Sequence, residues 1–379
     1  MLTTVHREET PEVQEVPPYF KQVFSCFQDT PRLKRMTSNN RFMSGDLIDS
    51  DIRVAKTLPS KYYTDEKRFR KILKSFKRTW QFVGLSDQFT SVITPIDHIG
   101  RVLNEPMVRI QDGESTHMLS NVCTHRGMVL CHEHSNTKTM QCPYHGRTFN
   151  RDGSMKHMPG FEDVVDFPSE DDHLTSFDVQ TWNGFEFTSL KSEVDVEDVF
   201  RPIQERLGWF FSDLEYNSEQ DRNWDIDANW MLYVDNYLEG FHIPYVHPEL
   251  NDVLDKDGYS TECFEHGVLQ IGMAKQGDVC FDIPESSVDA GKKIAAYYWW
   301  FFPKDSNYLS IVNKHIFKKS IFISCIFYKS SNFRSVGIDE PERLSHDSEL
   351  PSKSNIFLFL LGISKILPDT SIILSVVGC

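Results

Sequence analysis

Hydrophobic and polar residues first follow a regular pattern near residue 66. In residues 66–77, four apolar side chains recur at spacings of three, four and seven residues, which is the period of one face of an α-helix. Thr64 or Asp65 is the expected N-cap, because its side-chain oxygen can accept from the first free backbone N–H groups of the helix. The four apolar residues are Phe69, Ile72, Leu73 and Phe76.

The pattern then changes to short apolar runs separated by turn signals over residues 85–190, which predicts a small antiparallel β domain. Two of these turns are Gln111 to Gly113 and Arg151 to Gly153. Residues 195–207 follow as a helical connector. Residues 297–302 are apolar on both faces, which is typical of a buried strand.

These changes divide the chain into four parts and predict an α+β fold. Residues 1–56 are polar and proline-containing, and we expect a weakly ordered extension. The β domain with its preceding helix covers residues 57–190, and a mixed helix and strand domain covers 191–303. Residues 304–379 have a different composition, which is described below.

Composition narrows the classes of partner. The chain has 379 residues and a net charge of −15, which makes nucleic acid and anionic membranes poor partners. Eight cysteines at irregular spacing do not form the framework of a secreted disulfide protein. The N-terminal residues are acidic and lack an apolar core of a signal peptide, and no apolar run reaches the ~20 residues of a membrane-spanning helix. We expect a cytoplasmic protein without a membrane segment.

Two pairs of cysteine and histidine carry the strongest chemical signal. Cys123 and His125 are separated by one residue, and Cys142 and His145 by two. This arrangement matches the Rieske [2Fe–2S] site, in which two thiolates bind one iron and two imidazoles bind the other. Structural zinc is the alternative. Zinc pairs usually leave at least two residues between ligands, so the gap at Cys123 favours the iron–sulfur cluster.

A second group of candidate metal-binding side chains lies in residues 229–250. His242, His247 and several carboxylates in this span could supply part of a site with two histidines and one carboxylate, which leaves iron positions open for oxygen and substrate. On a regular helix the two histidines would diverge by about 140°. We expect Pro244 to kink the helix so that they converge, with Glu239 on the helix face of His242. Two ordinary core or surface histidines are the alternative.

The first motif, Cys-Thr-His-Arg-Gly followed by Cys-Pro-Tyr-His-Gly, resembles the Rieske domain of ring-hydroxylating oxygenase α subunits. Respiratory Rieske proteins carry one further cysteine in each motif, and these form a disulfide. Met128 and Tyr144 occupy those positions here, so the disulfide is excluded. Cys131 is then expected to be a free buried thiol.

The second motif, Asp-Asn-Tyr-Leu-Glu-Gly-Phe-His-Ile-Pro-Tyr-Val-His-Pro, resembles the mononuclear-iron segment of the same family and is closest to its choline-monooxygenase-like branch. The resemblance covers residues 57–303. It implies that His242 and His247 bind iron and that Asn236 approaches it. It also implies that Glu239 links a Rieske histidine of one subunit to an iron ligand of the next.

This resemblance implies an all-β Rieske domain followed by a catalytic domain with a helix-grip-like sheet. The implied enzyme is an oxidoreductase, a mono- or dioxygenase that hydroxylates a small organic substrate. It would use a [2Fe–2S] cluster, a mononuclear Fe(II), O₂ and NAD(P)H electrons from a separate ferredoxin or flavin reductase, in a homotrimer. A choline-like cation is one candidate substrate, and Tyr297, Trp299 and Trp300 are either aromatic contacts for it or plain core.

Residues 304–379 depart from the family. They contain no Trp, Ala, Met or Gln but 14 Ser and 11 Ile, and the acidic helix that supplies the third iron ligand is not recognisable. Either the segment is a divergent C-terminal half with Asp339, Asp347 or Asp369 as ligand, or it is translated non-coding or frameshifted sequence. Without a third ligand, the chain would be an electron-transfer or non-catalytic Rieske protein. A sterol-type Rieske oxygenase, which needs a membrane anchor, is a third interpretation.

Overall fold

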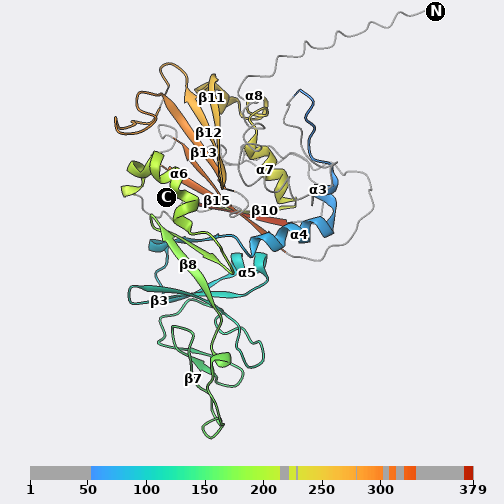
Figure 1. Cartoon of the computed structure of the whole chain (residues 1–379), viewed down its shortest axis with the longest axis vertical. Helices are drawn as coiled ribbons and strands as arrows, with labels where there is room; N and C mark the ends of the chain where they lie inside the picture. The colour runs from blue at the N-terminus through green and yellow to red at the C-terminus, as the bar shows by residue number, and fades with distance from the viewer. Residues whose placement is uncertain are drawn as a thin grey trace, which may run out of the picture.

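The computed structural model describes residues 53–213, 222–227, 229–278, 280–301, 307–312, 320–329 and 371–378. Within these residues the chain forms three β-sheets with helices packed around the largest one (Figure 1). The expected α+β class is confirmed. No helix in this described part of the chain is long and apolar enough to cross a membrane.

The N-terminal described residues form helices that pack on the sheets. The predicted helix at 66–77 is confirmed as α4, and Asp65 is its N-cap, with its side chain accepting from the backbone N–H of Arg68. At the other end of α4, the Phe76 ring meets the Trp230 ring edge-on, with the ring centroids 5.5 Å apart. The helices in this region are α3 (Lys61–Thr64), α4 (Glu66–Phe76) and α5 (Asp97–Leu103).

The β domain predicted for residues 85–190 contains a six-stranded antiparallel sheet, with the strand order β1-β9-β8-β4-β3-β2. Its strands are β1 (Gln81–Leu85), β2 (Ile93–Ile96), β3 (Met107–Asp112), β4 (Ser115–Ser120), β8 (Ser176–Trp182) and β9 (Phe185–Ser189). A buried ion pair crosses this sheet, where the Arg109 guanidinium donates to both carboxylate oxygens of Glu186 at 2.6 and 2.7 Å.

A smaller sheet, β5-β6-β7, sits at one end of the molecule (Figure 1). One Cys/His motif follows β4, and the other lies between β5 and β6. The large insertion between β4 and β8 therefore holds both motifs. Its elements are β5 (Met140–Gln141), β6 (Thr148–Phe149), β7 (Met155–His157) and the 3₁₀ turn η2 (Glu170–Asp172).

The largest sheet has seven strands in the order β10-β16-β15-β14-β13-β12-β11. The predicted buried strand is confirmed in β13, although that strand begins earlier than expected and ends at Phe301. The strands are β10 (Arg222–Asp227), β11 (Leu254–Phe264), β12 (Gly267–Ala274), β13 (Ile294–Phe301), β14 (Asn307–Val312), β15 (Ser320–Lys329) and β16 (Ser371–Gly378).

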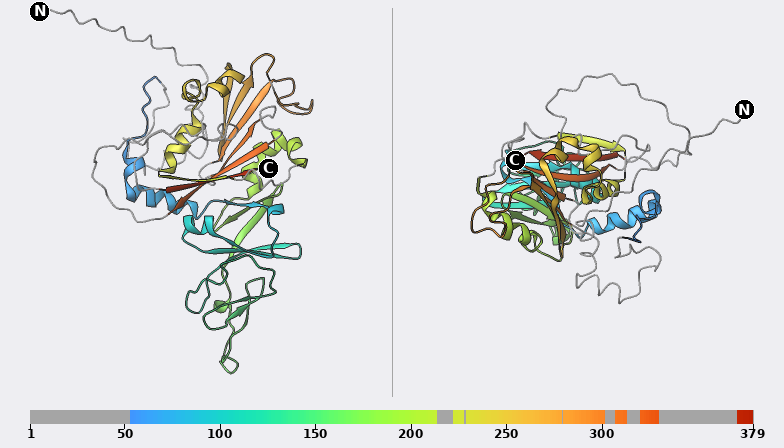
Figure 2. Two further views of the ribbon diagram at one scale, coloured as in Figure 1. Left: turned by 180° about the vertical axis from the view of Figure 1, so that it is seen from behind. Right: turned by 90° about the horizontal axis from the view of Figure 1, so that it is seen from above.

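Helices cover both faces of this sheet, and the two views of Figures 1 and 2 place α6 and α7 on opposite sides. Phe301 meets Phe200 of α6 with the ring centroids 4.7 Å apart, whereas Tyr298 meets Tyr237 of α7 at 6.4 Å. Residues 298 and 301 point to opposite faces because side chains alternate along a strand. These helical elements are α6 (Val196–Leu207), the 3₁₀ helix η3 (Gly208–Asp213), α7 (Trp230–Leu238), α8 (Ile243–Val246) and α9 (Pro248–Val253).

The predicted connector at 195–207 is confirmed as α6, and it contributes five buried side chains to the main core rather than only joining two domains. Most of the expected N-terminal extension, residues 1–52, lies outside the described residues. The described parts of the atypical segment are β14, β15 and β16, which pair with one another and with β10 and β13 in the large sheet. Asp339, Asp347 and Asp369 lie outside the described residues.

Candidate functional site

Each Cys/His motif closes the same tight backbone turn. The N–H of Gly127 donates to the carbonyl of Cys123, and the N–H of Gly146 donates to the carbonyl of Cys142, both at 3.0 Å. Both glycines have left-handed backbone angles, with φ of 71° and 75°, which glycine adopts without steric cost. The glycine that ends each motif is therefore needed to fold the loop that presents the cysteine and the histidine.

The two loops bring the four predicted ligands together. The thiols of Cys123 and Cys142 are both buried, and burial, together with the neighbouring Cys142 thiol, raises the pKa of Cys123. The imidazole rings of His125 and His145 lie 4.8 Å apart between centroids. Burial, followed by the nearby His145, lowers the pKa of His125, which favours the neutral ring that binds metal. Two adjacent thiols beside two adjacent imidazoles fit the donor set of a Rieske cluster.

The histidine side of this site faces outwards. The Tyr144 ring packs against the His145 ring at 3.9 Å between centroids and is 61% exposed. Met128 is also exposed, and these are the two residues that stand in place of the respiratory disulfide. Cys131 is a free thiol as predicted, but it is half-buried rather than fully buried, and burial raises its pKa. An exposed histidine edge is open to an electron-transfer partner.

The second predicted site forms where α7 ends. Glu239 follows the helix in extended backbone, with φ of −124°, and its carboxylate Oε1 lies 2.6 Å from Nδ1 of His242. The other carboxylate oxygen accepts from the N–H of Phe241 at 2.5 Å. His242 and His247 converge, with ring centroids 5.0 Å apart and nearly perpendicular ring planes.

Two geometric expectations for this site are wrong. Pro244 does not kink a helix between the histidines, because it lies in the first turn of the separate helix α8, where a missing N–H breaks no hydrogen bond. Glu239 does not share a helix with His242, because α7 ends at Leu238. The two histidines flank α8 at its two ends, and they meet because this helix is only four residues long.

His247 has the burial and the protonation state of a metal ligand. Its side chain is 4% exposed, and its Nε2 atom has no hydrogen-bond partner among the described residues. Burial, followed by the nearby His242, lowers the pKa of His247 to about 4. The ring is therefore neutral near pH 7, and an unpaired buried nitrogen is costly unless something binds it. Mononuclear iron with two histidine ligands fits this pair.

The rest of the predicted iron site is less complete. Asn236 is half-buried on α7, three residues before Glu239. Among the described residues, no group of three His, Cys, Asp or Glu side chains is placed to hold one metal ion. The third ligand stays a prediction, since the three candidate aspartates lie outside the described residues.

The aromatic residues of β13 belong mainly to the core. Tyr297 and Trp299 are fully buried and pack on Phe281 and Phe264, with 5.5 Å between ring centroids in each case. Between them, Tyr298 points to the opposite face, toward α7, and its hydroxyl is buried without a hydrogen-bond partner among the described residues. Tyr298 was not among the predicted aromatic contacts, although strict alternation along the strand separates it from its neighbours.

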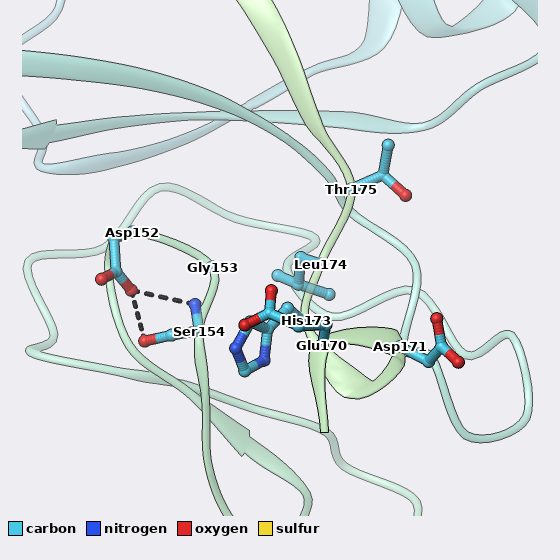
Figure 3. Close-up of a pocket in the computed structure, with 8 residues that line it drawn as sticks. All are labelled: Asp152, Gly153, Ser154, Glu170, Asp171, His173, Leu174 and Thr175. Atoms are coloured by element: carbon cyan, nitrogen blue, oxygen red, sulfur yellow. Dashed lines mark hydrogen bonds between the residues drawn. The ribbon is translucent and has the colours of Figure 1, made fainter. Parts of the chain in front are cut away.

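A surface pocket of about 540 Å³ lies beside the 3₁₀ turn η2 in the Rieske region (Figure 3). Asp152 forms a tight turn in its wall by accepting from the N–H and the hydroxyl of Ser154 at 2.9 and 2.6 Å. These two bonds lower the pKa of Asp152. None of the predicted metal ligands lines this pocket, whose lining residues are Asp152, Gly153, Ser154, Glu170, Asp171, His173, Leu174 and Thr175.

Two family models match this chain. Residues 79–168 match the Rieske [2Fe-2S] domain, and residues 213–313 match the ring hydroxylating alpha subunit (catalytic domain). The second match extends ten residues beyond Pro303, where the atypical composition begins.

Individual relatives point to the same family. The chain is 30% identical over 252 residues to the chloroplastic choline monooxygenase of Arabidopsis thaliana, covering 60% of this chain and 57% of that protein. It is 29% identical over 272 residues to the carnitine monooxygenase oxygenase subunit of Acinetobacter pittii, covering 68% and 71% of the two chains. The chain thus spans little more than half the length of the plant relative.

Solved structures share the fold. A quaternary ammonium Rieske monooxygenase aligns with a TM-score of 0.60 at 20% identity, covering 86% of this chain and 76% of that one. Naphthalene 1,2-dioxygenase from Rhodococcus sp. aligns with a TM-score of 0.58 at 18% identity, covering 85% and 73%. The chain belongs to the Rieske non-haem iron oxygenase α-subunit family, a family of oxidoreductases, and is related to the choline and carnitine monooxygenases.

Proposed function

We propose that this chain is the oxygenase component of a Rieske monooxygenase acting on a small quaternary ammonium compound. The observation that carries the proposal is the convergence of His242 and His247 at 5.0 Å between ring centroids, with Nε2 of His247 buried and unpaired. When bound, a mononuclear Fe(II) would supply O₂ activation, and a [2Fe–2S] cluster on Cys123, His125, Cys142 and His145 would supply electrons.

Glu239 has the role of orienting His242. If Nδ1 of His242 donates to Oε1 of Glu239 across 2.6 Å, the lone pair on Nε2 is left for the metal, and the imidazole becomes a stronger donor. The N–H of Phe241 fixes the other carboxylate oxygen at 2.5 Å. The carboxylate is therefore held at both oxygens, and it needs no rearrangement to serve as the support of a ligand.

Electron delivery is proposed to run between subunits of a homotrimer. The small sheet beside the cluster loops and helix α8 beside His242 lie at opposite ends of the molecule in Figure 1 and in the left view of Figure 2. Electron transfer within one chain would have to cross that length. A neighbouring subunit that docks its exposed histidine edge near Glu239 would shorten the path, and a separate ferredoxin or flavin reductase would supply the electrons.

The substrate class rests on the relatives and on the face of the large sheet that meets α7. The Tyr237 and Tyr298 rings lie 6.4 Å apart on that face, and aromatic faces attract quaternary ammonium groups. Gln270 adds a polar group, because its amide donates to the Tyr237 carbonyl at 2.9 Å and accepts from the Tyr259 hydroxyl at 2.8 Å. The net charge of −15 also favours a cation over an anion. A cytoplasmic location stays a prediction, since the plant relative is chloroplastic.

Substrate turnover tests this proposal. The full chain, reconstituted anaerobically with iron and sulfide, is reduced by dithionite and then mixed with O₂ and one of choline, carnitine or an aromatic acid. We expect a hydroxylated or cleaved product, detected by mass spectrometry, with a quaternary ammonium compound and none with the aromatic acid. Product only from the aromatic acid would refute the substrate class, and no product from any compound would favour the alternative below.

The alternative function is an electron-transfer Rieske protein without oxygenase activity. One observation favours it, because the described residues contain no third ligand beside His242 and His247. Such a protein would bind the cluster and accept one electron, but it would hold no mononuclear iron. The metal content of the purified chain separates the two functions, because the oxygenase would hold three irons per chain and the electron-transfer protein two.

A further inference from the structure

Arg147 connects the two loops that carry the cluster ligands. It lies two residues after His145, and its side chain is buried, with the residue 4% exposed. Its backbone carbonyl accepts from the N–H of Cys142 at 2.7 Å within the second loop. Its guanidinium Nη1 donates to the hydroxyl of Thr124 at 2.9 Å, between Cys123 and His125 in the first loop. One side chain therefore ties both loops together.

The other end of the guanidinium is paired with a carboxylate. Nη2 of Arg147 donates to Oδ1 of Asp172 in η2. The second oxygen of Asp172 accepts from the N–H and the hydroxyl of Ser169 at 2.8 and 3.0 Å, and Thr124 donates its hydroxyl to the Asp172 carbonyl at 2.8 Å. Both carboxylate oxygens are engaged, so Asp172 is held in place as an ionised partner.

The side chains of this ion pair are largely shielded from solvent. Nε of Arg147 is buried and has no hydrogen-bond partner among the described residues. The ring of Phe167 lies 5.5 Å from Cζ of the guanidinium. The Asp172 side chain is 21% exposed and the Arg147 side chain 5%. Charges in such a setting act over longer distances than they would in bulk water.

We propose that the Arg147–Asp172 ion pair balances the charge beside the [2Fe–2S] cluster, so that the loss of either charge alone shifts the reduction potential of the cluster. This inference rests on the proposed cluster binding. An oxidised core with charge +2, two thiolates and two neutral imidazoles sum to zero, and one added electron makes the site −1. The Arg147 cation therefore stabilises the reduced form, and the Asp172 anion opposes it. The pair leaves the site nearly neutral overall, and each half alone would move the potential in a different direction.

The test is a redox titration of the reconstituted full chain with dithionite and mediators, followed by the visible and EPR spectra of the cluster. Asp172→Asn should raise the potential, and Arg147→Gln should lower it. We expect each to change the one-electron equilibrium constant at least threefold, which corresponds to about 28 mV at 59 mV per tenfold change. The double variant should return close to the unmodified chain, because both charges are then absent.

Two matched variants separate charge from structure. Asp172→Glu keeps the anion, and Thr124→Val removes the loop-bridging hydroxyl without changing any charge. Both should leave the potential within the error of the unmodified chain, even if they lower the thermal stability of the domain. A merely structural role for Arg147 predicts instead that Thr124→Val and Arg147→Gln shift the potential alike.

The signs of the potential shifts in Asp172→Asn and Arg147→Gln decide the inference. Shifts of opposite sign for Asp172→Asn and Arg147→Gln support it. Shifts of the same sign, or no shift in Asp172→Asn while its cluster spectrum is intact, overturn it and leave the proposed function standing. If Arg147→Gln fails to retain a cluster, the comparison of Asp172→Asn with Asp172→Glu still gives the sign. An unmodified chain that takes up no cluster would overturn the proposed function and this inference with it.

Discussion

Replacing Glu239 by glutamine tests most closely whether its carboxylate orients His242 as an iron ligand. The carboxylate receives two short hydrogen bonds, from Nδ1 of His242 at 2.6 Å and from the N–H of Phe241 at 2.5 Å. Glutamine keeps the shape and one oxygen acceptor but removes the negative charge that strengthens the bond to His242. The Glu239→Gln variant should therefore still fold, but His242 should be a weaker and less well oriented metal ligand.

The size of the effect follows from the type of contact. Losing a carboxylate that supports a metal-bound histidine typically costs 10- to 100-fold in metal affinity. The Glu239 side chain is 34% exposed, and solvent moderates such a charge effect. We therefore expect the lower end of that range, about tenfold, which is about 1.4 kcal/mol.

The assay is an anaerobic titration of the cluster-loaded chain with Fe(II), or with Mn(II) followed by EPR. The cluster content should be unchanged in Glu239→Gln, while turnover per cluster should fall at least as far as the affinity does. Glu205→Gln, which neutralises an exposed carboxylate on α6, is the charge-matched control and should bind metal normally. Unchanged metal affinity and turnover in Glu239→Gln would refute the assigned role.

Three further predictions concern stability and loop geometry. The pKa of His247 is about 4 in the folded chain, against an ordinary value of 6.5. Its neutral form therefore stabilises the metal-free fold above pH 6.5, and this contribution is lost as the pH falls toward 4. His247→Asn should remove up to about one proton from the pH dependence of unfolding. Glu186→Gln should cost about 3–5 kcal/mol in urea unfolding, because it leaves a buried arginine without its carboxylate partner. Glu193→Gln, at a side chain that is 65% exposed, should cost under about 1 kcal/mol, and equal losses would contradict this. Gly146→Ala should destabilise the cluster loop more than Gly127→Ala. Both glycines have positive φ, but only at Gly146 would the new Cβ lie 3.3 Å from Pro159. Cluster retention on heating would show the order.

The candidate cluster ligands could be identified from the sequence because each requirement is local. A cysteine, a histidine and a terminal glycine lie within five residues in each motif, and the turn that presents them is closed by a bond from Gly127 or Gly146 back to the cysteine. Only the pairing of the two loops is long-range. The same locality explains why α4 and its Asp65 cap were predicted correctly.

The residues of the second candidate site were identified by their types, but their geometry was not predicted. Spacing suggested one kinked helix, whereas the chain leaves α7 at Leu238 and starts α8 again after His242. A proline is equally compatible with a kink inside a helix and with the first turn of a new one. The choice between these depends on how α7 and the following turns pack against the large sheet, which spacing does not encode.

Long-range pairings were outside the reach of the sequence pattern. The bond from Thr124 to Asp172 spans 48 residues, and that from Arg147 to Asp172 spans 25. Asp172 lies in a run of acidic residues that resembles an ordinary solvated turn. Only the fold places it against the cluster loops, so the charge pair became visible in the structure alone.

The iron and acid-labile sulfide content of the anaerobically reconstituted chain tests the central claim most directly. The account predicts three irons and two sulfides per chain, two irons in the cluster and one on His242 and His247. Two irons and two sulfides would contradict the oxygenase assignment and favour an electron-transfer protein. Zinc in place of iron, without sulfide, would contradict the cluster itself.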